Sequence, residues 1–165
     1  LPDDAATARA GAALGLALVP GDAVLLSGDL GAGKSALARA AVQALLALDG
    51  RVEDVPSPSF TLVQTYDTAR GEVWHADLHR LGGPDGVEEL GLEAAFDEAI
   101  CFVEWPDRLG PLAPPRRLEV SLAPAPGLGP EGEEGRRLRA SPRGAGWEPA
   151  LHALAQALRC EENGA

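Results

Sequence analysis

Residues 23–35 read AVLLSGDLGAGKS, a short apolar run followed by a glycine-rich loop. The apolar run, Ala23 to Ser27, is bounded by turn residues and predicts a strand buried on both faces. The loop, Gly28 to Ser35, matches G-x-x-x-x-G-K-[ST] in full, and the Ala- and Leu-rich residues after it predict a helix to about Leu48. Strand, loop and helix in this order predict a phosphate-binding site in an α/β fold.

Each part of the loop has a physical role in holding phosphate. Glycines allow positive φ, so that successive backbone N–H groups converge on one point, and the helix dipole adds positive potential there. Lys34 would place an ammonium group against the β- and γ-phosphates, and the Ser35 hydroxyl is suited to ligate Mg²⁺. We therefore expect a nucleoside triphosphate on the loop, whose residues are Gly28, Asp29, Leu30, Gly31, Ala32, Gly33, Lys34 and Ser35.

The cation of this loop is the only lysine in the chain, which otherwise uses thirteen arginines. A planar guanidinium group is larger than an ammonium group and reaches phosphate less well as a compact point charge. The composition therefore suggests that arginine cannot replace lysine at this position.

The sequence favours ATP over GTP. The Asn-Lys-x-Asp motif of common GTPases needs a second lysine, which this chain lacks. Transporter-type ATPases carry a Leu-Ser-Gly-Gly-Gln signature; residues 26–29, Leu-Ser-Gly-Asp, depart from it and belong to the phosphate loop.

A nucleotide site of this kind needs a further acid near the metal, and two acids follow apolar or β-rich runs. Asp77 ends the run 72–77, and Glu104 ends the run 100–104. A carboxylate at the carboxyl end of a core strand faces the crevice in which α/β sheets bind ligands. Either acid could hold Mg²⁺ or position the attacking water, and the residues alone leave both roles open.

Turn signals and apolar periodicity predict the remaining elements. We expect one domain, residues 1–165, with a mixed parallel and antiparallel sheet, flanking helices and a flexible loop over 123–135. The expected elements are a helix over 3–18, a short strand over 52–55, a hairpin of strands over 60–66 and 72–77, two short helices within 84–99 that break near Gly91, a core strand over 100–104, an antiparallel pair over 116–122 and 136–140, and a closing helix over 147–160.

Length and charge limit the classes of function. The chain has 165 residues, within the usual size of one domain, and a formal net charge of −11. This charge argues against a protein that grips a nucleic-acid backbone by electrostatics alone, but it allows action on RNA through a partner.

Cysteine usage and hydropathy favour a cytoplasmic protein. Cys101 and Cys160 form no CxxC pair and are expected to be reduced thiols. No apolar run approaches the roughly 20 residues of a membrane span, and no signal segment opens the chain. The chain begins at Leu1 and contains no methionine, so we expect that its natural start was trimmed or is missing.

Four motifs occur in order along the chain. They are the glycine loop 28–35, Ser-Pro-Ser-Phe-Thr-Leu-Val over 57–63, His-Ala-Asp-Leu-His-Arg-Leu over 75–81, and Val-Glu-Trp-Pro over 103–106. In their order and spacing they resemble the TsaE (formerly YjeE) family, bacterial ATPases of tRNA threonylcarbamoyladenosine biosynthesis. The resemblance covers roughly Asp22 to Pro106.

The resemblance assigns roles to individual residues. It implies that Asp77 serves Mg²⁺ or positions water, that Glu104 is the Walker B-type acid, and that Trp105 lies beside the nucleotide. His79 stands where the family usually has tyrosine. A mobile switch-like loop is implied over 57–61, with Ser57, Ser59 and Thr61 as its hydroxyl residues and Ser59 in place of a usual threonine.

The family resemblance implies a nucleotide switch. The chain would bind ATP and Mg²⁺, join a complex of TsaB and TsaD, and hydrolyse ATP to reset it, weakly when alone; tRNA would be reached only through that complex. The alternative is a P-loop small-molecule kinase with Arg136, Arg137 and Arg139 as a lid, although their alternation also fits an exposed strand. A third possibility is a nucleotide-dependent interaction module without catalysis.

Overall fold

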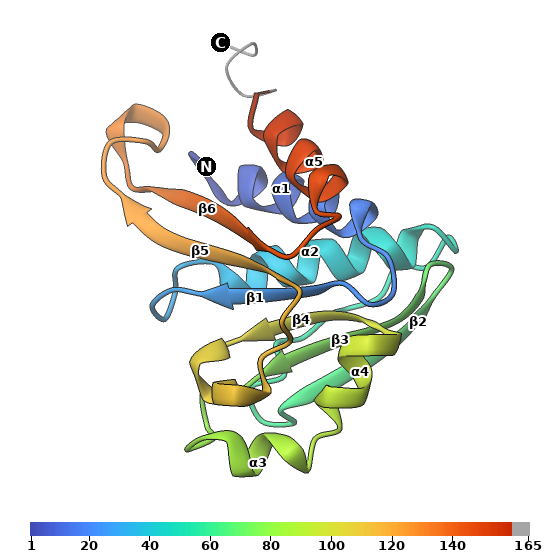
Figure 1. Ribbon diagram of the computed structural model, residues 1–165. Helices are drawn as coiled ribbons and strands as arrows, with labels where there is room; N and C mark the ends of the chain where they lie inside the picture. The colour runs from blue at the N-terminus through green and yellow to red at the C-terminus, as the bar shows by residue number, and fades with distance from the viewer. Residues whose placement is uncertain (160–165) are drawn as a thin grey trace.

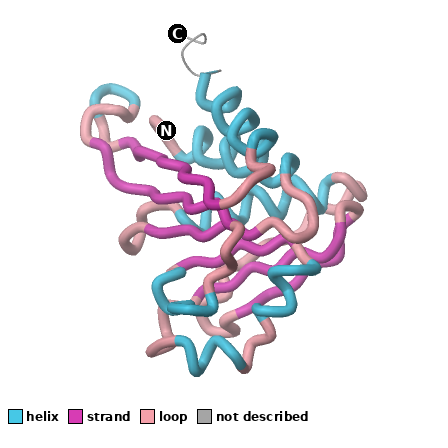
Figure 2. The backbone as a smooth tube through the Cα atoms, in the orientation of Figure 1, coloured by secondary structure: helices cyan, strands magenta, loops and turns pink. Residues whose placement is uncertain are grey.

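The computed structural model describes residues 1–159, which form one six-stranded mixed sheet with helices on both faces (Figures 1 and 2). The strand order is β2-β3-β4-β1-β5-β6, in which β3, β4, β1 and β5 are parallel and the two edge strands are antiparallel. This confirms the predicted α/β class. The strands are β1 Ala23–Ser27, β2 Val63–Thr68, β3 Gly71–Asp77, β4 Ile100–Glu104, β5 Arg117–Ala125 and β6 Gly135–Arg143.

The helices divide between the two faces of the sheet (Figure 1). Helices α1, α2 and α5 cover one face, whereas α3, α4 and the 3₁₀ segment η1 cover the other. Among the described residues, none of the helices is both long and apolar enough to cross a membrane. The bounds are α1 Asp4–Ala17, α2 Lys34–Ala47, α3 Pro84–Glu88, α4 Leu92–Glu98, η1 Pro106–Leu112, η2 Pro130–Gly132 and α5 Glu148–Arg159.

Local sequence explains where several elements begin. The Asp3 carboxylate accepts a hydrogen bond from the Ala6 N–H at 2.7 Å and caps α1, as expected for a helix beginning at an acidic residue. Gly91 separates α3 from α4 with a φ of 79°, the break predicted within 84–99. All five residues of β4 are buried because both faces of the sheet are covered there.

The predicted strand over 52–55 is wrong. Residues 51–58 carry no regular structure, and Val52 is fully exposed while Val55 is buried. The Val55 carbonyl accepts a hydrogen bond from Arg39 Nε at 2.9 Å, so a side chain of α2 takes the place of a neighbouring strand.

The hairpin also begins later than predicted. Residues 60–62 form a turn, with Leu62 at a φ of 69°, so β2 begins at Val63 rather than at residue 60. The turn between β2 and β3 contains two residues, and Thr68 pairs directly with Gly71.

The C-terminal pair of strands is longer than predicted. β5 continues to Ala125 and β6 begins at Gly135, so the connection spans 126–134 instead of 123–135 and contains the short turn η2. The segment η1, for which the sequence analysis predicts nothing, follows β4 directly. The end of the closing helix predicted at residue 160 lies outside the described residues, as does Cys160.

Candidate functional site

The glycine loop connects the end of β1 to the start of α2, as predicted. Gly28, Gly31 and Gly33 have φ values of 143°, 79° and 106°, which L side chains rarely adopt. A Cβ on Gly28 would lie 2.4 Å from the Leu122 carbonyl oxygen of the neighbouring strand β5. The loop therefore needs glycine both for its backbone conformation and for its close approach to the sheet.

The Lys34 side chain folds back into the loop. Its Nζ donates hydrogen bonds to the carbonyl oxygens of Gly28 at 2.5 Å and Asp29 at 2.8 Å, and it lies 4.6 Å from the centre of the Trp105 ring. The residue is only 5% exposed. Burial lowers the pKa of Lys34, while nearby carboxylates, Glu104 first, oppose this shift. The loop thus holds a desolvated ammonium group between carbonyl dipoles.

Ser35 and Glu104 meet in the site although 69 residues separate them. Glu104 ends β4 directly beside Leu26 of the parallel strand β1, and Ser35 lies in the first turn of α2. Ser35 Oγ donates to Glu104 Oε1 at 2.7 Å, and the other carboxylate oxygen lies 2.7 Å from Nε2 of the buried His75. Glu104 is 2% exposed. The carboxylate therefore has a fixed partner on each oxygen.

Asp77 lies beside Glu104 at the carboxyl end of β3, since the two residues are paired in the parallel register. Its Oδ1 accepts hydrogen bonds from the His79 backbone N–H at 3.1 Å and interacts with His79 Nδ1 at 2.8 Å. The structure thus brings both predicted acids to one edge of the sheet. The two acids differ in their contacts, because Glu104, and not Asp77, accepts a hydrogen bond from Ser35.

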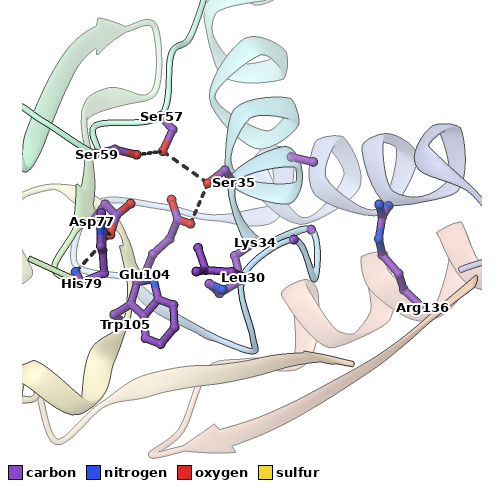
Figure 3. A pocket seen from close by; sticks show the side chains of 13 residues that line it. Leu30, Lys34, Ser35, Ser57, Ser59, Asp77, His79, Glu104, Trp105 and Arg136 are labelled. Carbon is purple, nitrogen blue, oxygen red and sulfur yellow. Dashed lines mark hydrogen bonds and ion pairs between the residues drawn. The ribbon is translucent and has the colours of Figure 1, made fainter. Parts of the chain in front are cut away.

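The hydroxyl residues predicted for the switch-like loop do not all reach the site. Ser57 Oγ lies 3.4 Å from Ser35 Oγ and 3.1 Å from Ser59 Oγ, which forms a chain of hydroxyls across the cleft (Figure 3). Thr61 is exposed and accepts a hydrogen bond from Gln64 Nε2 at 3.1 Å. The geometry thus places Ser57 and Ser59 at the cleft and leaves Thr61 outside it.

Trp105 is held in an unusual backbone conformation directly after β4, with a φ of 58°. The conformation turns the chain sharply out of the sheet, and Pro106 then begins η1. The half-buried indole ring lies beside Lys34, and its centre is 6.5 Å from that of the His79 ring. Trp105 therefore lies beside the lysine of the glycine loop, and its position next to a nucleotide stays a prediction.

Arg136, which the sequence suggests only as part of a kinase-type lid, lies at the site without its two companions. It comes from β6, and its half-buried side chain lies against Gly33, where a Cβ would come within 3.1 Å of the Arg136 Cδ and Nε atoms. Its Nη1 also bonds to Asp4 Oδ1 at 2.7 Å and Thr7 Oγ1 at 2.8 Å. No local motif indicates this position, which follows from the pairing of β6 with β5.

These side chains surround a cleft of about 370 Å³ at the carboxyl ends of β1, β3 and β4 (Figure 3). Of the predicted loop residues, Asp29 and Leu30 are exposed, whereas Ala32 is buried in the apolar core. The walls of the cleft include Lys34, Ser35, Ser57, Ser59, Asp77, His79, Glu104, Trp105 and Arg136.

The donor atoms fit a magnesium ion that takes most of its ligands from a nucleotide and water. A hydroxyl and carboxylates, from Ser35, Glu104 and Asp77, are the hard oxygen donors that Mg²⁺ prefers. Within residues 1–159, no three His, Cys, Asp or Glu side chains are grouped so as to hold a metal on their own.

Comparison with known proteins gives one family. The family model described as "Threonylcarbamoyl adenosine biosynthesis protein TsaE" matches residues 1–127, a wider range than the motif region between Asp22 and Pro106. The "tRNA threonylcarbamoyladenosine biosynthesis protein TsaE" of Rickettsia felis is 38% identical over 109 residues, which are 66% of this chain and 62% of the relative. The Bacillus subtilis protein is 34% identical over 104 residues, 62% of each chain. The match thus spans about three fifths of the length of these relatives.

A solved structure has the same fold. The crystal structure of YdiB from Bacillus subtilis aligns with a TM-score of 0.66 and covers 96% of this chain and 91% of the other, with 23% sequence identity. At this identity the likeness concerns the fold alone, and its coverage of 96% of this chain exceeds residues 1–127, which the family model matches.

Proposed function

The chain belongs to the TsaE family, which takes part in the biosynthesis of threonylcarbamoyladenosine in tRNA, and on this premise we propose that it is a Mg²⁺-dependent ATPase that acts as a nucleotide switch. The observation that carries the proposal is the convergence of Lys34, Ser35 and Glu104 in one cleft. A buried cation, a hydroxyl and a strand-end acid are the groups that phosphoryl transfer to water needs.

In this proposal each residue has a defined task. Lys34 exchanges its bonds to the loop carbonyls for phosphate oxygens, and the loop N–H groups bind the remaining phosphate oxygens. Ser35 Oγ would release Glu104 and hold Mg²⁺, and Glu104 or Asp77 would orient the attacking water. Bound Mg²⁺ supplies positive charge that offsets the charge of the phosphates. Trp105 excludes water from one side of Lys34.

We further propose that the switch works with partner proteins, the TsaB and TsaD components of the same modification, in the cytoplasm. Two large apolar side chains near the cleft support a protein partner: Leu30 is 84% exposed and Phe60 is 82% exposed. Leu30 is part of the cleft wall, and Phe60 follows Ser59 in the switch-like loop. With a net charge of −11, the chain would contact tRNA only through those partners.

The alternative of a small-molecule kinase receives less support from the geometry. A lid made of Arg136, Arg137 and Arg139 would need all three guanidinium groups over the phosphates. Arg136 faces α1 and the glycine loop, whereas Arg137 and Arg139 are exposed. Because side chains alternate along a strand, Arg137 lies on the face of β6 opposite to Arg136.

Phosphate release from Mg-ATP tests the proposal, measured for this chain alone and with purified TsaB and TsaD. We expect slow release by the chain alone and faster release with the partners. Lys34→Ala should abolish it, and Glu104→Gln should retain ATP binding but reduce turnover to a small residual rate. Arg137→Ala, an exposed cation outside the cleft, is the matched control. Absence of stimulation and of complex formation would contradict the switch, and a phosphorylated small-molecule product would favour the kinase.

A further inference from the structure

We propose that His75 is the positioning residue for Glu104, an inference that rests on the proposed ATPase function and adds a residue to it. In this role the His75 Nε2–H holds Glu104 Oε2, so that Oε1 alone faces Ser35 and the cleft. His75 never touches the nucleotide. It fixes the orientation of the Glu104 carboxylate, which faces the nucleotide site.

Strand register brings the two side chains together. His75 and Asp77 lie two residues apart on β3 and therefore share one face of the strand. On the neighbouring parallel strand, Glu104 pairs in register with Asp77, and Phe102 pairs with His75. Val73 and Phe102 belong to the apolar cluster beneath α2, so this face of the sheet is the one toward which Ser35 projects. The contact between His75 and Glu104 is therefore a diagonal pair between adjacent strands.

The surroundings of the imidazole ring select one tautomer. His75 is fully buried, its Nε2 lies 2.7 Å from Glu104 Oε2, and its Nδ1 has no hydrogen-bond partner among residues 1–159. A proton on Nδ1 would be a buried donor without an acceptor, and it would leave the Nε2 lone pair against a carboxylate oxygen. A proton on Nε2 alone satisfies the carboxylate and leaves only a weak acceptor unpaired. The geometry thus assigns the Nε2–H tautomer.

The two hydrogen bonds on Glu104 differ in permanence. Ser35 lies at the start of a helix and lines the cleft, so its hydroxyl can exchange Glu104 for a ligand. His75 lies within a central strand, fully buried, and has no route to another partner. When Ser35 leaves, Oε2 stays held and Oε1 becomes available in a fixed direction. Hydrogen bonds of this kind typically change activity by about 10–100-fold when they are removed.

Two variants of His75 separate positioning from packing. His75→Leu removes the donor at similar volume, whereas His75→Gln keeps an N–H at about the position of Nε2. We expect His75→Leu to lower kcat for ATP hydrolysis by roughly 10–100-fold with little change in Kd for Mg-ATP, and His75→Gln to restore most of the loss. His152→Leu, on the exposed side of α5, is the matched control. Equal effects of leucine and glutamine, or an unchanged kcat in both, would overturn the inference.

A second measurement is independent of nucleotide, metal and turnover. Imidazole ¹⁵N chemical shifts of the ligand-free wild-type chain report which nitrogen carries the proton. We expect the Nε2–H form for His75; a proton on Nδ1 alone would refute the inference even if the ATPase proposal stands. In contrast, a wild-type chain that hydrolyses no ATP with its partners overturns the proposed function, and with it the role of His75.

A double-substitution experiment adds a test of coupling. If His75 acts through Glu104, His75→Leu should reduce the residual turnover of Glu104→Gln no further. Additive effects would mean that His75 acts elsewhere and would contradict the positioning role.

Discussion

Lys34 is the only lysine among 165 residues, and its surroundings explain why arginine would not serve there. The ammonium group fits between the carbonyl oxygens of Gly28 and Asp29 and under the Trp105 ring, in a position that is almost fully buried. A guanidinium group is wider and cannot occupy this space without displacing the loop. The composition and the geometry thus both indicate that position 34 requires lysine and not arginine.

Lys34→Arg should therefore weaken binding of Mg-ATP by about 10²-fold, the loss expected when one charge-assisted contact to phosphate is removed. Titration calorimetry with Mg-ATP measures the change. The reverse control is Arg137→Lys, a cation exchange at an exposed position outside the cleft, which should leave affinity unchanged. Wild-type affinity in Lys34→Arg would mean that a positive charge is enough to bind Mg-ATP, whatever the shape of the cation.

Cys101 makes a prediction for stability at alkaline pH. Burial, and to a smaller extent Glu72, raises the pKa of the thiol from 9.0 to about 12. The unfolded chain loses this proton near pH 9.0, whereas the folded chain keeps it to higher pH. The folded state therefore binds more protons in this interval, and stability must fall as pH rises through it, by up to about 1.4 kcal/mol per pH unit.

Urea unfolding at a series of pH values above 9.0 checks this slope. Tyr66, whose pKa burial also raises, contributes in the same direction, and Lys34, whose pKa burial lowers, contributes in the opposite one. The difference between the wild type and Cys101→Ala in the slope of unfolding free energy against pH isolates the contribution of the thiol, because the other groups are the same in both. We expect a shallower decline in Cys101→Ala; equal slopes would mean that the thiol ionises without unfolding.

The contact between α1 and α2 depends on two glycines. A Cβ on Gly11 would lie 2.4 Å from the Leu37 carbonyl oxygen, and a Cβ on Gly15 would lie 2.7 Å from the Ala41 carbonyl oxygen. Both would meet backbone atoms, which cannot move aside as a side chain can. The two helices therefore approach more closely than any larger residue at these positions would allow, and α2 carries Lys34 and Ser35 at its first turn.

Gly15→Ala should lower the free energy of unfolding by roughly 1–3 kcal/mol, although alanine favours an isolated helix by about 1 kcal/mol. Overpacking against the backbone of α2 outweighs the gain in helix propensity. Chemical denaturation measures the change, with Gly82→Ala as the control, since a Cβ there meets nothing within 4 Å. A stabilised Gly15→Ala variant would show that the helices can separate at little cost.

Arg116 connects parts of the molecule that are remote in sequence. Its Nη1 donates to Asp22 Oδ1 at 2.6 Å, and its guanidinium carbon lies 4.3 Å from the centre of the Trp147 ring. Asp22 is buried and also accepts a hydrogen bond from the Val19 N–H at 2.9 Å. One side chain thus joins the segment before β1, the segment before β5 and the segment before α5.

Arg116→Ala should destabilise the fold by about 1–3 kcal/mol, because it leaves the Asp22 carboxylate buried with one partner fewer. The side chain of Arg116 is 39% exposed, so solvent screening places the expected value below that of a fully buried pair. Arg117→Ala, next in the chain and paired with Glu119 near the surface, should cost less than half as much. Thermal and urea unfolding of both variants test this order, and equal losses would contradict it.

Much of the architecture could be predicted because its signals are contiguous. The strand, glycine loop and helix around Gly28–Ser35 occur as expected, since a phosphate loop needs neighbouring residues whose backbone amides converge. The apolar run ending at Glu104 and the break at Gly91 are local in the same sense. Predictions were wrong where a residue distant in sequence determines the local conformation. The predicted strand over 52–55 is an example, because the Val55 carbonyl accepts a hydrogen bond from Arg39 instead of from a neighbouring strand.

The division of contacts between the two acids could not be predicted from local sequence. Asp77 and Glu104 both end core strands, and only the register of β1, β3 and β4 shows that Ser35 meets Glu104. The same register gives Glu104 its second partner, His75. Arg136 reaches the glycine loop through the pairing of β6 with β5.

Residue type and spacing therefore account for the conformation of the glycine loop and for the class of the fold, because these depend on backbone conformation within a few residues. The arrangement around the loop depends instead on contacts between residues 29, 69 and more positions apart. Such contacts form only when the sheet aligns its strands and the helices pack against it, α1 against α2 and α5 against α1. Burial then excludes water as a hydrogen-bond partner, so each buried polar group bonds only to the protein groups that packing places beside it.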